Sequence, residues 1–511
     1  MVLTLINQAE MLLSPLSLSL LGFIISTTLL LLRSKHSTSS PSLNLPPCPP
    51  KLPLIGNLHQ LGTLVHRSLR DLAQKHGPLM LLRLGQANVL VVSSAEMAKE
   101  IMKNQDLVFA DRPPTTPAKA LLYECRDVGF APYGEYWRQV RKLCVLDLLS
   151  IKRVQSYKFI REVEVSRLVE KISRSAPTRT RINLSEMLSS LSNNVVARCT
   201  FGSIYESEDG KNRFGELAKR VMRLMGEFSV GDFFPSLGWM DIFTGLKGRL
   251  ESASKELDVF FDRIINEHLM MKSNGDDQQF LIDRLILAQK DRTLDVKLQK
   301  DDLKAIMMDM FIGGTDTTAT TTEWAMAELI KNPKQMNKVQ EEVRRVVGNK
   351  MKVEEEDIQH MDYLKCIVKE TLRLHAPVPT LVPREAVRSA TINGYHIPAK
   401  TRVFVNAWAI QRDSKVWDKA EEFVPERFLS TNIDFKGHDF EFIPFGSGRR
   451  SCPGIAFGLS VVEFVLANLL YWFDWELPDG EIKEGLDMTE VFGLTVNKKF
   501  PLLLVPTLHS V

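Results

Sequence analysis

A stretch of 22 residues without a single charge, Met11 to Leu32, constrains most strongly how this 511-residue chain can fold. Glu10 precedes it, and a basic cluster begins at Arg33 directly after it. As a helix the stretch would be roughly 33 Å long, enough to cross a hydrocarbon core of about 30 Å. The alternative, a cleaved signal peptide, needs a basic start, a shorter apolar core and a small-residue cleavage site, and none of the three is clear. We therefore predict a retained membrane anchor over residues 1–32, and the basic flank predicts that the remaining chain is cytosolic.

Composition excludes several other classes of protein. The 65 Lys and Arg residues nearly balance the 62 Asp and Glu residues, so no strong field attracts a polyanion and nucleic acid is not expected as a partner. The six cysteines are spread singly without a C-x-x-C pair, which argues against a disulfide framework or a cysteine zinc site.

After the anchor, the pattern predicts one large body. Residues 33–53 are rich in Ser and Pro and predict an extended hinge. No later linker is long enough to separate two domains, so residues 54–511 are expected to form a single domain, mainly α with small β-sheets. Helices are expected near 301–331, 333–347, 361–375 and 455–473, strands around 79–92 and 402–406, and a helix opened by a capping box of Ser93 and Glu96.

Cys452 lies in the segment FGSGRRSCPG, directly before an apolar helical pattern. Pro453 suits the first position of a helix, so Cys452 is expected at a helix N-terminus, where free N–H groups and the helix dipole stabilise a thiolate. The glycines let the backbone bend close to a bulky group, and Arg450 adds positive charge. A lone cysteine is usually a small buried hydrophobe. These neighbours favour a ligand instead.

The same segment resembles a known family. Phe445, Gly448, Arg450, Cys452 and Gly454 match the haem-binding signature F-x-x-G-x-R-x-C-x-G of the cytochrome P-450 monooxygenases. Three separate matches accompany it: Glu370 with Arg373 in E-x-x-R and Arg427 in Pro425–Phe428, Gly313–Thr318 in the oxygen-activating helix, and Trp137 with Arg141 in W-x-x-x-R. The resemblance spans the chain and implies the cytochrome P-450 fold, one large haem domain behind the anchor, with haem b ligated by the Cys452 thiolate. A thiolate ligand favours O–O cleavage.

The resemblance implies catalytic roles for Asp316 and Thr317. Two adjacent glycines, Gly313 and Gly314, weaken the helical hydrogen-bond ladder and predict a local bulge that can hold O₂ and water. Thr317 would hydrogen-bond the distal oxygen, and Asp316 would relay protons through water. The alternative is that the threonine hydroxyls bond to carbonyls one turn earlier and that Asp316 faces solvent.

Glu370 and Arg373 share one helix face, which by itself fits a surface ion pair of little energetic value. The resemblance implies instead a buried structural network with Arg427 behind the cysteine loop.

Haem propionates are expected to meet Trp137 and Arg141, which lie four residues apart and so share one helix face. The resemblance adds Arg450 and Arg384 to the propionate contacts and Phe445 to the residues around the haem.

Electrons must come from another protein, because the sequence has no dinucleotide-binding glycine motif, P-loop or flavin-type extra domain. The resemblance implies an NADPH-dependent flavoprotein reductase in the endoplasmic reticulum membrane. Arg138 and Lys142 are candidate docking residues, or members of an ordinary solvated helix face.

The substrate is expected to be a lipophilic small molecule, because the segments that the resemblance places around it are mostly apolar: 110–128, 307–314, 378–382 and 491–495. The motif style resembles plant A-type enzymes of specialised metabolism. A terpenoid is favoured over a phenylpropanoid, coumarin or alkaloid.

Two other functions are compatible with the haem signature. A rearranging enzyme would need neither O₂ nor a reductase, but such relatives depart from the Gly-Gly-x-Asp-Thr pattern that is present here. A non-enzymatic haem-binding membrane protein would have no use for Asp316 and Thr317.

Overall fold

The computed structural model describes residues 19, 22, 26, 43–203, 213–271, 280–291, 294–350, 352–478 and 485–509. The predicted anchor, apart from the three isolated positions, and most of the predicted hinge lie outside these residues. Both stay predictions.

Contacts divide the chain into two compact units. The small unit comprises residues 1–45 and 393–396, and the large unit comprises residues 46–392 and 397–511. Within the small unit, the Asn44 side-chain amide donates to the Gly394 carbonyl at 2.8 Å. Within the large unit, Leu81 donates its backbone N–H to the Pro47 carbonyl at 2.9 Å, so the last part of the predicted hinge is held on this unit.

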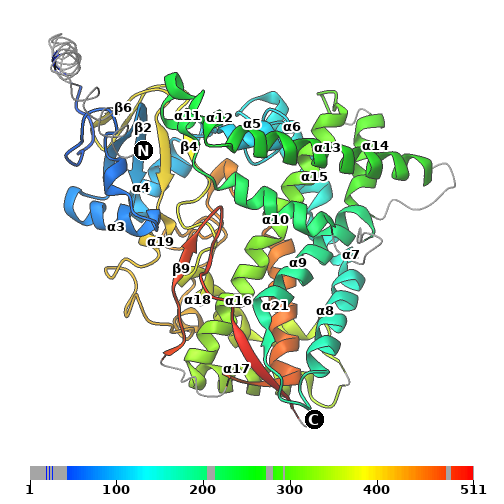
Figure 1. Cartoon of the computed structure of the whole chain (residues 1–511). Helices are drawn as coiled ribbons and strands as arrows, with labels where there is room; N and C mark the ends of the chain where they lie inside the picture. Colours follow the sequence, from blue (N-terminus) through cyan, green and yellow to red (C-terminus); the bar gives the residue numbers. More distant parts are fainter. Residues whose placement is uncertain are drawn as a thin grey trace, which may run out of the picture. The chain divides into compact units, whose positions relative to one another are not determined.

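Helices make up most of the large unit (Figure 1). They are α3 (Val65–His76), α4 (Ala95–Lys99), α5 (Thr116–Leu121), α6 (Glu135–Leu143), α7 (Ile151–Ser156), α8 (Lys158–Ser173), α9 (Leu184–Phe201), α10 (Arg213–Met225), α11 (Val230–Phe233), α12 (Met240–Phe243), α13 (Leu246–Met271), α14 (Leu281–Asp291), α15 (Lys300–Gly314), α16 (Asp316–Lys331), α17 (Pro333–Val347), α18 (Asp362–Leu374), α19 (Ala407–Ile410), α20 (Arg427–Ser430) and α21 (Ile455–Trp472). Shorter turns of helix that bear on the site are η2 (Glu100–Asn104), η3 (Cys144–Leu148) and η7 (Gly448–Arg450).

The strands are short and form small sheets, as predicted. They are β1 (Leu79–Leu84), β2 (Ala87–Val92), β3 (Ile182–Asn183), β4 (Arg384–Glu385), β5 (Ala390–Ile392), β6 (Tyr395–Ile397), β7 (Arg402–Val405), β8 (Phe473–Glu476), β9 (Glu490–Phe492), β10 (Val496–Lys498) and β11 (Leu503–Leu508). One sheet has the order β1-β2-β7-β4, with β2 parallel to β7 and the other pairs antiparallel. Another has the order β3-β11-β8, and β9 pairs with β10 as a hairpin.

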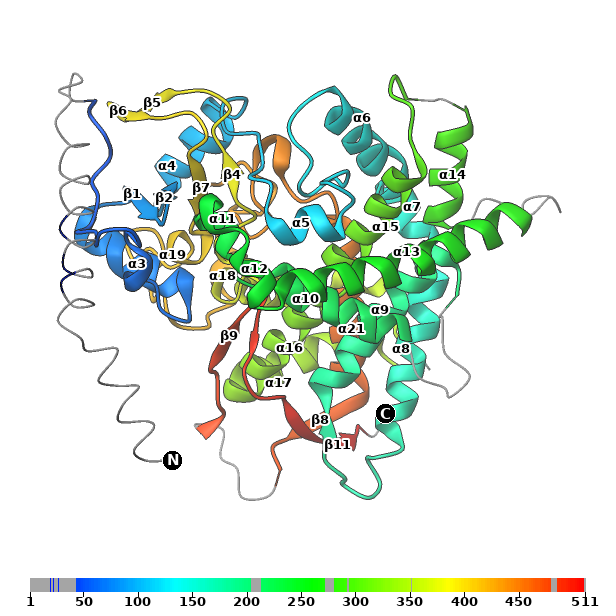
Figure 2. The same ribbon diagram turned by 45° about the horizontal axis from the view of Figure 1, so that its top comes forward.

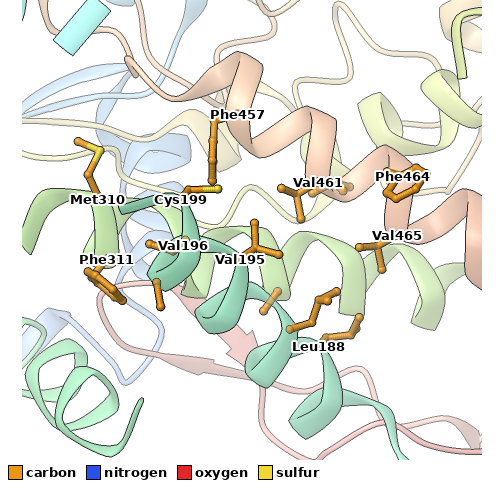
Figure 3. Packing of buried hydrophobic residues seen from close by; sticks show 14 of the residues in the cluster. Leu188, Val195, Val196, Cys199, Met310, Phe311, Phe457, Val461, Phe464 and Val465 are labelled. Carbon is orange, nitrogen blue, oxygen red and sulfur yellow. The ribbon is translucent and has the colours of Figure 1, made fainter. Parts of the chain in front are cut away.

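Helix α16 packs against both α9 and α21, and α8 contacts α9 and α21 as well. Figure 3 shows Leu188 and Val195 of α9 in one cluster with Val461 and Val465 of α21, with Phe311 of α15 at the end of the cluster. The Phe311 ring stacks on Phe201 with 5.1 Å between centroids. These side chains are apolar and buried, so the hydrophobic effect fixes the helices that carry the motif residues.

Helix α21 is long and apolar enough to span a bilayer, and it is the one such helix among the described residues. About 61% of its residues are buried inside the large unit. It is therefore a core helix, and it does not replace the predicted N-terminal anchor.

The β9–β10 hairpin lies beside α16, at the lower left of Figure 2. Its first strand is tied to α3, because Glu490 accepts hydrogen bonds from His66 Nε2 at 3.2 Å and Arg67 Nε at 2.8 Å. The turn at residues 493–495 is thereby held near the N-terminus of α16.

Two predictions of local structure are wrong. Helix α4 is capped by Ser94, whose hydroxyl accepts from the Met97 N–H, and not by Ser93. Helix α21 begins at Ile455 with Gly454 as its N-cap, so Pro453 precedes the helix and is not its first residue. In both places the local motif was displaced by one or two residues.

Candidate active site

The cysteine loop folds tightly before α21. The Cys452 N–H donates to the Phe445 carbonyl at 2.9 Å, which closes the loop on itself. Gly448 has a φ of +71°, and a Cβ there would lie 2.1 Å from the Met102 carbonyl oxygen, so only glycine fits against η2. The Phe445 ring meets Phe435 edge to face at 5.3 Å.

The environment of the Cys452 sulfur works in two directions. Burial raises the pKa of the thiol, while the Gly454 N–H and the positive charge of Arg141 lower the pKa. The Gly454 N–H lies 3.3 Å from the sulfur. This N–H and the nearby cation are what a thiolate bound to a metal requires around it.

Four arginines gather around this loop. Arg450 donates to the carbonyls of Ala110 at 2.7 Å and Ala131 at 2.6 Å, and its guanidinium lies 4.1 Å from the centre of the Trp137 ring. Arg141 donates to the Ser451 carbonyl at 2.5 Å.

The other two arginines come from distant parts of the chain. Arg384 pairs with Asp106 at 3.0 Å and donates to the Ser447 carbonyl at 2.7 Å. Arg112, which sequence reasoning did not select, donates to the carbonyls of Gly129 at 2.9 Å and Pro383 at 2.7 Å.

This cluster carries more positive than negative charge. Burial, and then repulsion by neighbouring arginines, lowers the pKa of Arg112, and the same causes lower that of Arg450 to about 9. A buried cation is stable only with an anion beside it, and the carboxylates near these arginines, Asp106, Asp111 and Asp127, leave excess charge. The cluster therefore fits a group with two carboxylates, as haem has.

The indole N–H of Trp137 is not free to bind a propionate at the arginine cluster. Its indole N–H donates to the Val128 carbonyl at 3.0 Å. The tryptophan thus meets the cluster through its ring face under Arg450.

The long helix predicted over 301–331 is two helices, because α15 ends at Gly314 and α16 begins at Asp316. The predicted weak point beside the paired glycines is confirmed. A Cβ on Gly314 would lie 2.9 Å from Val196, whereas one on Gly313 would meet nothing within 4 Å. Among the described residues, one side of the break is therefore packed and the other is open.

Thr317 and Asp316 are held in different ways. The Thr317 hydroxyl donates to the Gly313 carbonyl one turn earlier at 2.5 Å, the back-bonding that was the alternative prediction. Asp316 does not simply face solvent: its carboxylate accepts from the Thr495 hydroxyl and from Asn497 Nδ2 at 3.5 Å.

A cavity of about 390 Å³ adjoins Asp316. It lies between α9, α10, the α15–α16 junction and the β9–β10 turn, and sequence reasoning did not predict the contribution of α9 and α10. Its lining mixes apolar and polar side chains: Met222, Met308, Phe311, Leu494, Ser189, Asn193, Lys219, Arg223, Thr495 and Asn497.

Glu370 and Arg373 form a buried ion pair with both side chains at 0% exposure. Arg373 Nε and Nη2 bind the two carboxylate oxygens at 2.8 and 2.9 Å, and Arg427 Nε binds Glu370 at 3.1 Å. The geometry is therefore a three-membered network, not a surface pair.

Gln411 joins this network to the cysteine loop, a link that sequence reasoning missed. Its carbonyl accepts from Arg373 at 2.8 Å, and its side-chain oxygen accepts from the Ile443 N–H at 3.0 Å. Gly446 in turn donates to the Ile443 carbonyl at 3.0 Å. The ion pair is thus connected to the loop by hydrogen bonds.

A family model described as Cytochrome P450 matches residues 46–504. The chain belongs to the cytochrome P450 family. This P450 is 60% identical over 459 residues to Cytochrome P450 71A1 of Persea americana, covering 89% of this chain and 91% of that protein. It is 52% identical over 497 residues to the phenylacetaldehyde oxime monooxygenase of Prunus mume, covering 95% of this chain and 94% of that protein.

A solved structure of a zebra fish cytochrome P450 with progesterone has a TM-score of 0.75, at 24% identity, and covers 86% of this chain and 99% of that chain. This likeness concerns the fold, and it confirms the predicted fold class. The family match and the two plant relatives confirm that the chain is a monooxygenase with a cysteine-ligated haem and resembles plant P450 enzymes. The family acts on lipophilic substrates with O₂ and a redox partner reductase.

Proposed function

We propose that this P450 hydroxylates a lipophilic plant specialised metabolite, with Cys452 as the iron ligand and Asp316 and Thr317 as the proton-handling pair. The observation that carries the proposal is the coexistence of a cysteine loop closed on itself, four surrounding arginines and a helix break directly after Gly314. The net reaction takes the substrate, O₂, NADPH and a proton to the alcohol, water and NADP⁺.

The residues that would hold haem b are those of the loop and the arginine cluster. The Cys452 sulfur would ligate the iron, Phe445 would lie beside the ring, and the cluster with Trp137 would face the propionates: Arg112, Arg141, Arg384 and Arg450. When bound, a thiolate-ligated haem supplies the activation of O₂.

The chain's own part in catalysis is to bring protons to the distal side. The Thr317 hydroxyl hydrogen is engaged by the Gly313 carbonyl, so its oxygen presents lone pairs to a water. The Asp316 carboxylate lies at the edge of the cavity, where it can take a proton from water and pass it inward after rotating away from Thr495.

Electrons would come from an NADPH-dependent flavoprotein reductase on the thiolate side, in the endoplasmic reticulum membrane. Arg138 and Lys142 on α6 are the proposed contacts. Arg138 is about half exposed and pairs with Glu135 one turn earlier, a surface pair that a partner's carboxylate can replace at little cost. Residues 1–32 would anchor the chain in the same membrane.

The substrate proposed first is a terpenoid, ahead of phenylpropanoids, coumarins and alkaloids. The segments that the family resemblance places around the substrate, among them 307–314 and 491–495, are mostly apolar, which favours a lipophilic guest with few charges. A screen of these four classes and of phenylacetaldehyde oxime, with the reductase and NADPH, tests the order. Conversion of a non-terpenoid alone would overturn it.

The ligand assignment is tested by a reduced carbon monoxide spectrum of microsomes. Wild type and Cys366→Ala, which changes a buried cysteine outside the loop, should give the thiolate-type Soret band. Cys452→Ala should lack it. A normal band from that variant would disprove the assignment.

A further inference from the structure

Two aspartates far apart in sequence, Asp127 and Asp309, meet beside the arginine cluster. Asp127 precedes α6 and is 0% exposed. Asp309 lies on α15 one turn before Gly313 and is half-buried. Neither belongs to a family motif in the sequence, and neither has a role in the proton path described above.

The two carboxyl groups lie close enough for a hydrogen bond between them to couple their pKa values. A carboxylate ion has no hydrogen to donate, so a bond between two carboxyl groups requires a proton on one of them. A Cβ on Gly129 would lie 3.1 Å from Asp127 Oδ2 and 3.4 Å from Asp309 Oδ1, which shows that both groups converge over this residue. The other oxygen of Asp127 is buried and has no hydrogen-bond partner among the described residues.

The same carboxyl groups bind the backbone N–H groups of residues 127–131. Val128 donates to Asp309 Oδ2 at 2.5 Å, and Phe130 donates to Asp127 Oδ2 at 2.7 Å. An acid pair thus occupies one side of the segment.

The carbonyl groups of this segment bind the haem-facing side chains. Val128 accepts from the Trp137 indole at 3.0 Å and from Arg450 at 3.3 Å. The Gly129 carbonyl accepts from Arg112 at 2.9 Å. Every one of these contacts depends on the path of one short stretch of backbone.

We propose that Asp127 and Asp309 act as a single acid pair that shares one proton and holds residues 127–131 in the path that orients Arg112, Trp137 and Arg450 toward the haem. Both are positioning residues, since they reach the haem only through this segment. The inference rests on the proposed cofactor contacts.

Charge balance supports one proton on the pair. The cations that face it are Arg112 and Arg450, and the other titratable groups around it are Cys125, Tyr136 and Cys144. Burial raises the pKa of those three neutral groups, so they bring no charge near neutral pH. Burial, and then repulsion by Asp127, raises the pKa of Asp309 well above its usual range.

The sign of the pH dependence follows. A carboxyl whose pKa is higher in the folded state stabilises the fold at low pH, and this stability is lost as the pH rises through the folded pKa. Above that pH two negative charges would lie side by side, and the segment would separate from α15. Haem retention should therefore fall with alkali.

Asp309→Asn separates the shared proton from a purely steric role. The Asn oxygen can accept from Val128, and its amide can donate to Asp127, so it imitates the protonated acid at every pH. Asp309→Leu removes both bonds. Asp301→Asn, at the exposed start of α15, is the matched control.

The measurement is transfer of haem from the full-length P450 to apomyoglobin and the unfolding temperature, between about pH 6 and pH 10. Wild type and Asp301→Asn should lose haem up to roughly tenfold faster for each pH unit as the pH rises toward the pKa of the pair, and the rate should level off above it. Asp309→Asn should show a flat profile, and Asp309→Leu rapid loss throughout. The proposal is overturned if Asp309→Asn follows the wild-type profile or behaves like Asp309→Leu. Failure of the proposed function would instead appear as a missing Soret band in wild type at neutral pH.

Discussion

Thr495 donates a hydrogen bond from its hydroxyl to the carboxylate of Asp316, and so joins the β9–β10 turn to the first residue of α16. Asn497 adds a second contact to the same oxygen and a third to the Thr495 hydroxyl. The acid proposed to deliver protons is therefore held by a hairpin whose other end is bound to α3 through Glu490.

Thr495→Val should release this carboxylate while conserving volume. Without the hydroxyl, Asp316 loses its main partner and samples more rotamers, so proton delivery becomes less ordered. We expect less product per NADPH consumed and more hydrogen peroxide, with a normal carbon monoxide spectrum. Thr322→Val is the control, because its hydroxyl binds only the Thr318 carbonyl. Equal coupling in both variants would contradict a role for Thr495.

Thr317→Ala removes the hydroxyl that binds the Gly313 carbonyl. We expect uncoupling that the structure-preserving Thr317→Ser restores, because serine keeps the same donor and acceptor. Peroxide and product are measured together in a reconstituted system with the reductase. If alanine couples as well as serine, the hydroxyl takes no part in the reaction.

Glu370→Gln should destabilise the fold strongly. It leaves Arg373 buried beside a neutral amide, and breaking a buried pair in this way costs about 3–5 kcal/mol. Unfolding temperature and haem content should both fall, since Gln411 connects this pair to the cysteine loop. Glu170→Gln, in a surface pair with Arg174, should change stability by less than about 0.5 kcal/mol. If Glu370→Gln and Glu170→Gln lost similar amounts of stability and haem, the buried network would be no more important to the fold than a surface ion pair.

The buried carboxylate of Glu490 should make the stability of the fold depend on pH in the acid range. Burial opposes its ionisation, but hydrogen bonds from His66 and Arg67 lower its pKa to about 2. The stabilisation is present above the unfolded pKa and is lost as the pH falls toward 2, with a total of about 3 kcal/mol. The Glu490→Gln variant should therefore have a lower free energy of unfolding than wild type at neutral pH. Between about pH 5 and pH 2 its stability should change less with pH than that of wild type. If the unfolding temperatures of variant and wild type change in parallel across this pH range, the Glu490 carboxylate does not contribute to the pH dependence of stability.

Deletion of residues 1–32 should loosen attachment to microsomes and leave haem binding intact. The measurement is the fraction of Soret-active protein in the supernatant after centrifugation. Loss of all folded protein would mean that this segment belongs to the core.

The sequence predicted the parts of the site that depend on local spacing. Cys452, Glu370 with Arg373, and the paired glycines occur in short patterns whose geometry follows from a loop or one helix turn, and the structure places each in that local form. Helix ends were less accurate, as at Ser94, because adjacent serines are chemically equivalent caps and only tertiary packing chooses between them.

Contacts between distant segments were not predictable in the same way. Arg112 and Gln411 resemble many other polar residues in the sequence. Their roles arise because the fold brings Arg112 to a carbonyl 270 residues away and brings Arg373, 38 residues away, to the carbonyl of Gln411. Asp309 lies on the helix that was selected for Gly313, yet its partner Asp127 is in the loop between α5 and α6.

Helix α21 also bears on how the protein is made. Its apolar length alone would satisfy the machinery that inserts segments into membranes, and 61% of it must instead be covered by protein. It lies near the C-terminus, at Ile455–Trp472, so the helices that cover it, among them α8, α16 and α17, leave the ribosome first. Because of this order, the helices that cover α21 are already synthesised when this apolar helix emerges, so it can pack against protein instead of entering the membrane.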